Sequence, residues 1–377
     1  MAARATRNPA PWIFLWSRAL IWLAAVFAFL WFEPNRHPLA GRWDSPLLHQ
    51  LGYGIDVWAR WDSAFFLRIA EHGYDGTSAA FYPLYPGVVA LLGRTLGGQY
   101  VLAGVLVSLA ACLGAFALLY RLAEANLGAD AARRTVVYLA ICPMALFLGA
   151  VYSESLYLLL AVAAFVLAER GRFLEAGVVV GLAILTRATG VALLPALALL
   201  AWPRRRAVWE LAVAIPIAAV YPLVLWRQVG DPWAFWGAQD LWHRHLSWGG
   251  PLGGIWDGVH ALWGPTPSGA APMHASAVNI EGLVALVVCL WLTVVAWRRV
   301  GAAYGLFAAL SLAIPLSLPS SRWPLLSLPR FALVIFPLFM ALAVVGSRPR
   351  AHTVIVAASA LLLGVAVTQW ALWQWVS

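Results

Sequence analysis

One carboxylate interrupts the apolar face of a helix predicted after residue 57. On a helical wheel, this face is formed by Trp58, Trp61, Phe65, Phe66 and Ile69. Polar and small residues occupy the other sides, which predicts an amphipathic helix lying in a membrane interface. Asp62 falls in the middle of the apolar face, where an unpaired carboxylate is strongly disfavoured. Asp62 either pairs with a buried arginine for structural reasons or belongs to a functional site. We favour the site, because a helix that only binds lipid needs no acid there.

The composition indicates a protein that crosses a membrane many times. The chain has 377 residues, of which 63% are hydrophobic and only 11% are charged, and its mean hydropathy is +0.80. Soluble domains contain about 25% charged residues, so we predict an all-α polytopic membrane protein. The net charge is +9 and all 25 basic residues are arginine. These arginines lie between apolar stretches, so the charge does not indicate nucleic-acid binding.

The apolar stretches predict about eleven transmembrane helices within a single domain of residues 1–377. They lie at residues 12–31, 100–121, 134–150, 155–169, 173–186, 190–202, 207–226, 281–297, 302–318, 330–346 and 352–374. Two long loops remain, at residues 32–99 and 227–280, and the second is rich in tryptophan. The first apolar stretch has no cleavage signal after it, so we expect a retained helix. The stretch after Pro83 is apolar for only about ten residues before Arg94, too few to cross, so we expect it to be buried or re-entrant.

Arginine clusters orient these helices. With the N-terminus inside, the inner loops contain Arg121/Arg133/Arg134, Arg170/Arg172, Arg204/Arg205/Arg206, Arg298/Arg299 and Arg348/Arg350. Every cluster then obeys the positive-inside rule. If residues 83–97 crossed the membrane, all of these clusters, which follow that segment, would face outward. The pattern therefore predicts an outward C-terminus and an outer position for both long loops.

The same orientation brings unusual polar residues to the outer face. They are Asp62, Glu71, Ser153-Glu154-Ser155, Arg187, Arg322 and Arg330. Arg187 is the least expected, because apolar and small residues surround it on both sides. Polar groups at one end of several helices indicate a single site at that membrane face.

Other polar and aromatic residues admit two interpretations each. Glu154 stands at a helix start between two serines, where an acid caps the helix or belongs to the site. Tryptophans in the 227–280 loop can stack on sugars but also populate membrane interfaces, and we favour the interface. His243 and His245 alone are weak evidence for a metal. The three cysteines lie in apolar runs, so we predict no metal ligands.

Four stretches, in chain order, resemble motifs of one known enzyme family. The first runs from Trp61-Asp62 through Glu71-His72-Gly73-Tyr74 to Phe81-Tyr82-Pro83-Leu84-Tyr85-Pro86. The others are Tyr152-Ser153-Glu154-Ser155-Leu156, Thr186-Arg187-Ala188-Thr189-Gly190, and Leu328-Pro329-Arg330-Phe331 followed by Phe336-Pro337. Together they resemble the glycosylphosphatidylinositol mannosyltransferase II (PIG-V-like) family, in a prokaryotic member. The stretch between Tyr74 and Phe81 is shorter than expected for that family, which affects acceptor recognition more than chemistry.

The resemblance implies a GT-C glycosyltransferase in a prokaryotic plasma membrane. Such an enzyme takes a hexose, here expected to be mannose, from a polyprenyl phosphate and inverts the anomeric centre at the extracytoplasmic face. The acceptor is expected to be a glycolipid or glycan. No cofactor is expected, and a lone aspartate argues mildly against a tightly bound divalent ion. The alternative function is a transporter or flippase of a lipid-linked sugar. Transporters place polar groups at the bilayer midplane and often contain repeats, and neither feature is visible here.

The residue types suit glycosyl transfer independently of the resemblance. Asp62 is the candidate general base for the acceptor hydroxyl. Arg187 and Arg330, with Arg322 third, are candidates for the donor phosphate, because arginine stays charged and makes bidentate contacts.

Five residues are candidates for the acceptor or for support of the site: Glu71, Tyr74, Tyr82, Tyr85 and Glu154. Glu71 lies about 180° from Asp62 on a continuous helix, so it either supports the helix end or has a separate site role. The tyrosines line an acceptor groove or lie at the interface.

Overall fold

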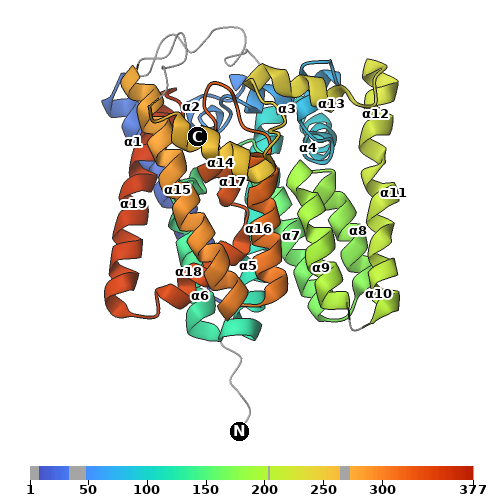
Figure 1. Ribbon diagram of the computed structural model, residues 1–377. Coiled ribbons are helices and arrows are strands. Elements are labelled where there is room, and N and C mark those ends of the chain that lie inside the picture. Colours follow the sequence, from blue (N-terminus) through green and yellow to red (C-terminus); the bar gives the residue numbers. More distant parts are fainter. Residues whose placement is uncertain (1–7, 34–47, 203, 264–271, 377) are drawn as a thin grey trace.

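The computed structural model describes residues 8–33, 48–202, 204–263 and 272–376. Within these ranges the secondary structure is helical, apart from one isolated antiparallel bridge between Arg244 and Ser320. The helices stand side by side as a bundle (Figure 1). The predicted all-α class is therefore confirmed.

Helices occupy every predicted span. Five stretches are long and apolar enough to cross a membrane: α1 (Ala10–Trp31), α5 (Tyr100–Leu127), α10–α12 (Arg205–Val229), the Ala277–Arg299 part of α15 (Pro272–Arg299), and α19 (Pro349–Ala371). The other predicted spans fall on shorter helices: α6 (Ala129–Ile141), α7 (Glu154–Glu169), α8 (Phe173–Ile184), α9 (Leu193–Ala201), α16 (Ala302–Leu316), α17 (Leu328–Ala332) and α18 (Phe336–Val345). Hydropathy therefore located the helices well.

The shorter helices are interrupted where polar residues occur. Pro143 follows α6, and residues 142–153 form a short 3-10 turn and loop before α7 begins. Residues 185–187 separate α8 from the next helical turn, and residues 317–327 separate α16 from α17. Irregular backbone at membrane depth persists only where it is buried in protein or lines a cavity. These interruptions therefore mark where a site can form.

The two ends of the bundle differ. Short helices gather at the upper end in Figure 1: α2 (Tyr53–Asp56), α3 (Ser63–His72), α4 (Leu84–Thr95), α13 (Ala234–Gly237) and α14 (Gly250–His260). The α5–α6, α9–α10 and α18–α19 turns, which adjoin predicted inner arginine clusters, lie at the lower end. The segment after Pro83 is the 12-residue α4, which packs on α3 and α5 without running through the bundle.

The predicted amphipathic helix is wrong in its extent and its surroundings. α3 begins only at Ser63, because Trp61 adopts a left-handed φ of 54° and Asp62 is the N-cap. Most of its residues are buried, including the small Ser63 and Ala64 on the supposed polar side. Small side chains let neighbouring elements approach from that side, so α3 is enclosed by protein instead of lying with one face in lipid.

Candidate active site

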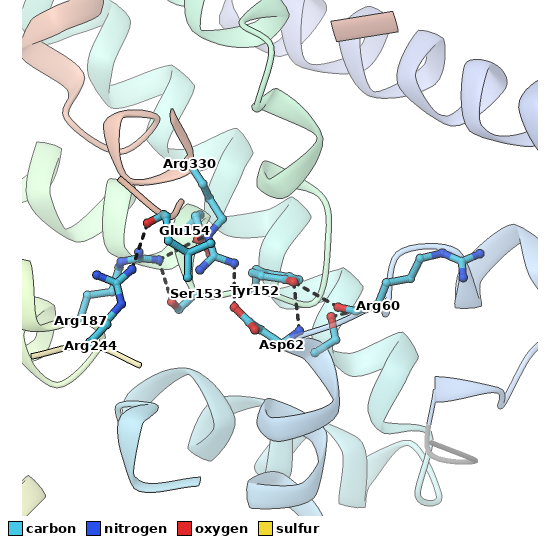
Figure 2. Close-up of polar contacts among 10 residues, drawn as sticks. Arg60, Asp62, Tyr152, Ser153, Glu154, Arg187, Arg244 and Arg330 are labelled. Carbon is cyan, nitrogen blue, oxygen red and sulfur yellow. Dashed lines mark hydrogen bonds and ion pairs between the residues drawn. The ribbon is translucent and has the colours of Figure 1, made fainter. Parts of the chain in front are cut away.

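A cavity of about 380 Å³ opens where the interrupted helices meet the two long loops. Its wall contains two carboxylates, Asp62 and Glu154, and three guanidinium groups, Arg187, Arg244 and Arg330. Figure 2 shows these five side chains converging from different parts of the chain. The cavity therefore combines a possible base with an excess of cations.

Asp62 is held by its backbone as well as by its side chain. Its N–H donates to the Tyr152 hydroxyl at 3.2 Å, and that hydroxyl donates to the carbonyl of Arg60 at 3.1 Å. Tyr152 is buried and comes from the interruption before α7. One tyrosine thus fixes the turn that carries Asp62 at the edge of the cavity.

Arg330 is the partner of the Asp62 side chain. Its Nη1 donates to Asp62 Oδ2 at 2.7 Å, whereas Asp62 Oδ1 has no hydrogen-bond partner among the described residues. The guanidinium lies 5.3 Å from the ring centre of Tyr152 and 5.5 Å from that of Phe147. These aromatic rings restrict the arginine, so the ion pair has a defined geometry.

Glu154 bridges Arg187 and Arg330, the two arginines that the sequence predicts to bind the phosphate of the sugar donor. Its Oε1 lies 2.8 Å from Arg187 Nη1 and 3.5 Å from Arg330 Nε, and Arg187 Nη1 also lies 3.4 Å from Ser153 Oγ. Glu154 is the first residue of α7, but neither its side chain nor that of Ser153 makes a capping hydrogen bond. Of the two interpretations of Glu154, this geometry favours the site over the cap.

Arg244 is a cavity residue that the sequence did not single out. It comes from the tryptophan-rich loop, and its Nη1 and Nη2 donate to the carbonyls of Leu318 and Leu326 at 2.9 and 3.0 Å. Burial and, to a smaller extent, the positive charge of Arg330 lower the pKa of the Arg244 guanidinium to about 10, although the negative charge of Asp62 opposes this shift. The sequence offered no signal for this contact, because 74 and 82 residues separate the partners.

The predicted tyrosines divide between the cavity and the core. Tyr82 lines the cavity. Tyr85 is fully buried, and its hydroxyl contacts Ser108 Oγ at 2.9 Å. Tyr74 is outside the cavity lining, and its hydroxyl donates to the carbonyl of Phe81 at 2.7 Å. Tyr74 and Tyr85 therefore stabilise the loop and the helix packing around the cavity.

Glu71 and Arg322 are not brought to the cavity. Glu71 is exposed on α3, on the far side from Asp62, and its Oε2 lies 3.8 Å from His72 Nε2. Arg322 is exposed and absent from the cavity lining. The geometry gives neither residue a direct role. The third arginine in the cavity wall is Arg244, and not Arg322 as the sequence predicts.

A segment near residue 375 forms another wall that the sequence did not reveal. Trp375 lines the cavity and packs edge-on against Trp61, with ring centres 5.3 Å apart. Trp61 also packs against Trp373 at 5.7 Å, and the Arg60 guanidinium lies 4.1 Å above the Trp373 ring. Both residues that precede Asp62 are thus held by this segment.

Backbone strain concentrates around the cavity. Among the described residues, four non-glycine residues have a left-handed φ: Trp61, His243, Ser327 and Trp373. Ser327 lines the cavity, Trp61 and His243 each adjoin a lining residue, and Trp373 is two residues from Trp375. Strain of this kind persists where the surrounding structure enforces it and clusters at functional sites.

Metal ligands are not apparent in the part of the chain that the structure describes. No group of three or more His, Cys, Asp or Glu residues in it could hold a metal ion. The cavity offers two carboxylates, and both lie against arginine. We therefore assign no residue to a metal.

Comparison with known proteins finds a family similarity over residues 51–201. Residues 51–201 match the family model described as Mannosyltransferase (PIG-V). This match confirms the predicted resemblance over the segment that carries Asp62, Glu154 and Arg187. GPI alpha-1,6-mannosyltransferase 2 of Rattus norvegicus is 33% identical over 172 residues. That similarity covers 42% of this chain and 34% of the rat protein, so the chain matches about a third of its relative's length.

Solved structures support the fold. ArnT from Cupriavidus metallidurans in the apo state superimposes with a TM-score of 0.52 and 16% identity, over 92% of this chain and 61% of ArnT. ArnT bound to undecaprenyl phosphate gives a TM-score of 0.51 and 16% identity, over 92% and 63% of the two chains. The predicted GT-C-like fold is therefore confirmed.

Proposed function

We propose that the protein transfers a hexose, with mannose the first candidate, from a polyprenyl-phosphate sugar to a glycolipid or glycan acceptor, with inversion. The observation that carries the proposal is the position of Asp62 in the wall of a cavity that also contains three guanidinium groups. A base and a cationic phosphate site are the two requirements of this reaction. The mannosyltransferase family match over residues 51–201 supports the sugar.

Asp62 acts as the general base in this proposal. The acceptor oxygen attacks the anomeric carbon, and its proton passes to Asp62 Oδ1, the oxygen that has no partner among the described residues. Arg330, which donates to Oδ2, orients the carboxylate. Positioned proton transfer of this kind contributes about 10²–10⁴ in rate.

Arg187 and Arg330 receive the leaving group. As the bond between the anomeric carbon and the phosphate oxygen breaks, negative charge grows on the polyprenyl phosphate while the sugar gains oxocarbenium character. Guanidinium groups can stabilise that charge with paired hydrogen bonds. The ArnT structure with undecaprenyl phosphate supports a lipid phosphate as ligand of this fold.

Glu154 has a supporting role. It lies against both Arg187 and Arg330, so it sets the distance between the two cations before the donor binds. Because Glu154 lies beside Arg330, Arg330 keeps an anionic neighbour when a substitution removes the charge of Asp62. A variant of Asp62 can therefore report on chemistry without leaving a lone buried cation.

The extracytoplasmic side of a prokaryotic plasma membrane is the proposed location of the reaction. The short helices α2, α3 and α13 lie at one end of the bundle, and turns adjoining predicted inner arginine clusters lie at the other (Figure 1). Positive charge is retained on the cytoplasmic side, so the end with α3 and Asp62 faces outward.

Transfer by the purified protein tests the proposal. We expect polyprenyl-phosphate mannose and a glycolipid or glycan acceptor to give an extended acceptor and free polyprenyl phosphate. In vesicles, a flippase would instead move a lipid-linked sugar between leaflets without cleaving it. Translocation without transfer, for every acceptor tried, would favour that alternative.

A further inference from the structure

Three guanidinium groups surround one aromatic ring in the cavity. The central carbons of Arg187, Arg244 and Arg330 lie 5.4, 5.4 and 5.5 Å from the ring centre of Phe331. Figure 2 shows Arg187 and Arg244 together on the same side of the cluster, opposite Asp62. The ring faces attract each cation, but a ring carries no net charge.

The cavity carboxylates are already engaged elsewhere. Asp62 pairs with Arg330, and Glu154 lies between Arg187 and Arg330. Arg244 forms no ion pair with any carboxylate of the described residues, and its partners are two backbone carbonyls. The cavity wall therefore has one cation more than its acids balance.

Burial makes this excess of positive charge unfavourable. Desolvation and the charge of Arg330 both lower the pKa of Arg244. A buried cation without a counter-charge destabilises the protein unless hydrogen bonds or a bound anion compensate it. The two carbonyls compensate in part, and an anion in the cavity would complete the balance.

We propose that Arg244 is a third phosphate-binding arginine, which contacts the phosphate of the lipid-linked donor together with Arg187 and Arg330. This inference rests on the proposed function and adds to it a residue outside the family-matched segment 51–201. A guanidinium has five N–H donors, and the carbonyls of Leu318 and Leu326 each accept from one terminal nitrogen. The remaining donors are available to a phosphate.

A purely structural role is the competing explanation. Arg244 lies in a strap that joins residues 242–247 to residues 317–326. Backbone hydrogen bonds already form this strap, from His245 to Pro319, from Ser247 to Ser317 and from Ser321 to His243, at 3.1, 3.0 and 2.8 Å. Ser320 Oγ adds a bond to the carbonyl of Trp242 at 2.8 Å. These bonds form the strap without the Arg244 side chain, whose two further bonds to Leu318 and Leu326 need donors but no positive charge.

Lipid binding separates the two roles. We would measure the affinity of the full-length protein for polyprenyl phosphate and for the uncharged polyprenol, using wild type, Arg244→Gln and Ser320→Ala. Ser320→Ala is the matched control, because it weakens the same strap without changing a charge or a cavity residue. A charge-assisted hydrogen bond corresponds to about 10- to 100-fold in affinity.

Arg244→Gln should bind polyprenyl phosphate at least about tenfold more weakly and polyprenol as wild type does. Ser320→Ala should bind both lipids as wild type does. Unchanged phosphate affinity in Arg244→Gln, or an equal loss for both lipids, would overturn the proposal. If the Gln protein cannot be recovered, Arg244→Lys gives the same test, because it loses the planar fork and should weaken binding of the phosphate alone. If wild type itself prefers polyprenol, the proposed function fails instead.

Discussion

Arg330 Nη1 donates to Asp62 Oδ2 at 2.7 Å across 268 residues of sequence. The contact joins α17 to the turn before α3, and both side chains line the cavity. One arginine therefore orients the proposed base while it remains within the proposed phosphate site. Structural pairing and a catalytic role, which the sequence left as alternatives for Asp62, are compatible in this geometry.

Arg187→Lys should weaken donor binding while the protein still folds. Lysine keeps the positive charge but loses the planar guanidinium that contacts Glu154 and that we propose to bind the phosphate. We expect the KM for the polyprenyl-phosphate sugar to rise about tenfold, which corresponds to loss of one charge-assisted hydrogen bond. Steady-state kinetics in detergent check this, and an unchanged KM and kcat would count against the role.

Glu154→Gln should destabilise the protein as well as slow it. The change leaves Arg187, whose side chain is only 14% exposed, without its buried carboxylate partner. Loss of one partner from a buried ion pair reduces the free energy of unfolding by about 3–5 kcal/mol. Thermal unfolding in detergent measures this, with added polyprenyl phosphate expected to restore part of the stability because it supplies a new anion. A fully stable Glu154→Gln protein would show that the arginines do not depend on this acid.

Cysteine labelling in intact cells tests the orientation. Single cysteines at Asp75, His245 and Arg322 should react with an impermeant thiol reagent, and cysteines at Asp130, Arg204 and Arg348 should be shielded. All six positions are exposed, and the native cysteines Cys112, Cys142 and Cys289 are buried, so background should be low. Outside labelling at Arg204 would reverse the positive-inside assignment and the proposed face of the site.

Sequence patterns located most of the helices and four of the charged cavity residues. The membrane sets the length of an apolar helix and the side on which arginines gather, so both patterns are visible within short stretches of the sequence. Asp62, Glu154, Arg187 and Arg330 stood out because charge within apolar surroundings is rare and indicates function.

Tertiary contacts account for what the sequence missed. The helical wheel failed before Asp62 because the left-handed Trp61 ends the regular geometry, and only packing against Trp373 and Trp375 explains that conformation. In the sequence, Arg244 resembles any other arginine in a loop. Only the folded strap places it beside Phe331. Neither arrangement leaves a periodic or compositional signal.

Glu71→Gln is the matched control for the proposed base. It makes the same change from acid to amide as Asp62→Asn, near the opposite end of α3, but Glu71 is exposed and outside the cavity lining. Its transfer rate should stay within about twofold of wild type, as expected for a surface substitution. A larger defect than that of Asp62→Asn would make Glu71 the better candidate for the base.

The turnover of Asp62→Asn tests the central claim most directly. Asparagine keeps the size of Asp62 and can still accept a hydrogen bond from Arg330, and Glu154 remains 3.5 Å from Arg330 Nε as a counter-charge. We therefore expect a folded protein that binds polyprenyl-phosphate mannose normally. Loss of the base should slow single-turnover transfer by at least about 100-fold. Transfer at a near-normal rate by the donor-bound Asn protein would contradict the account and remove Asp62 from the mechanism.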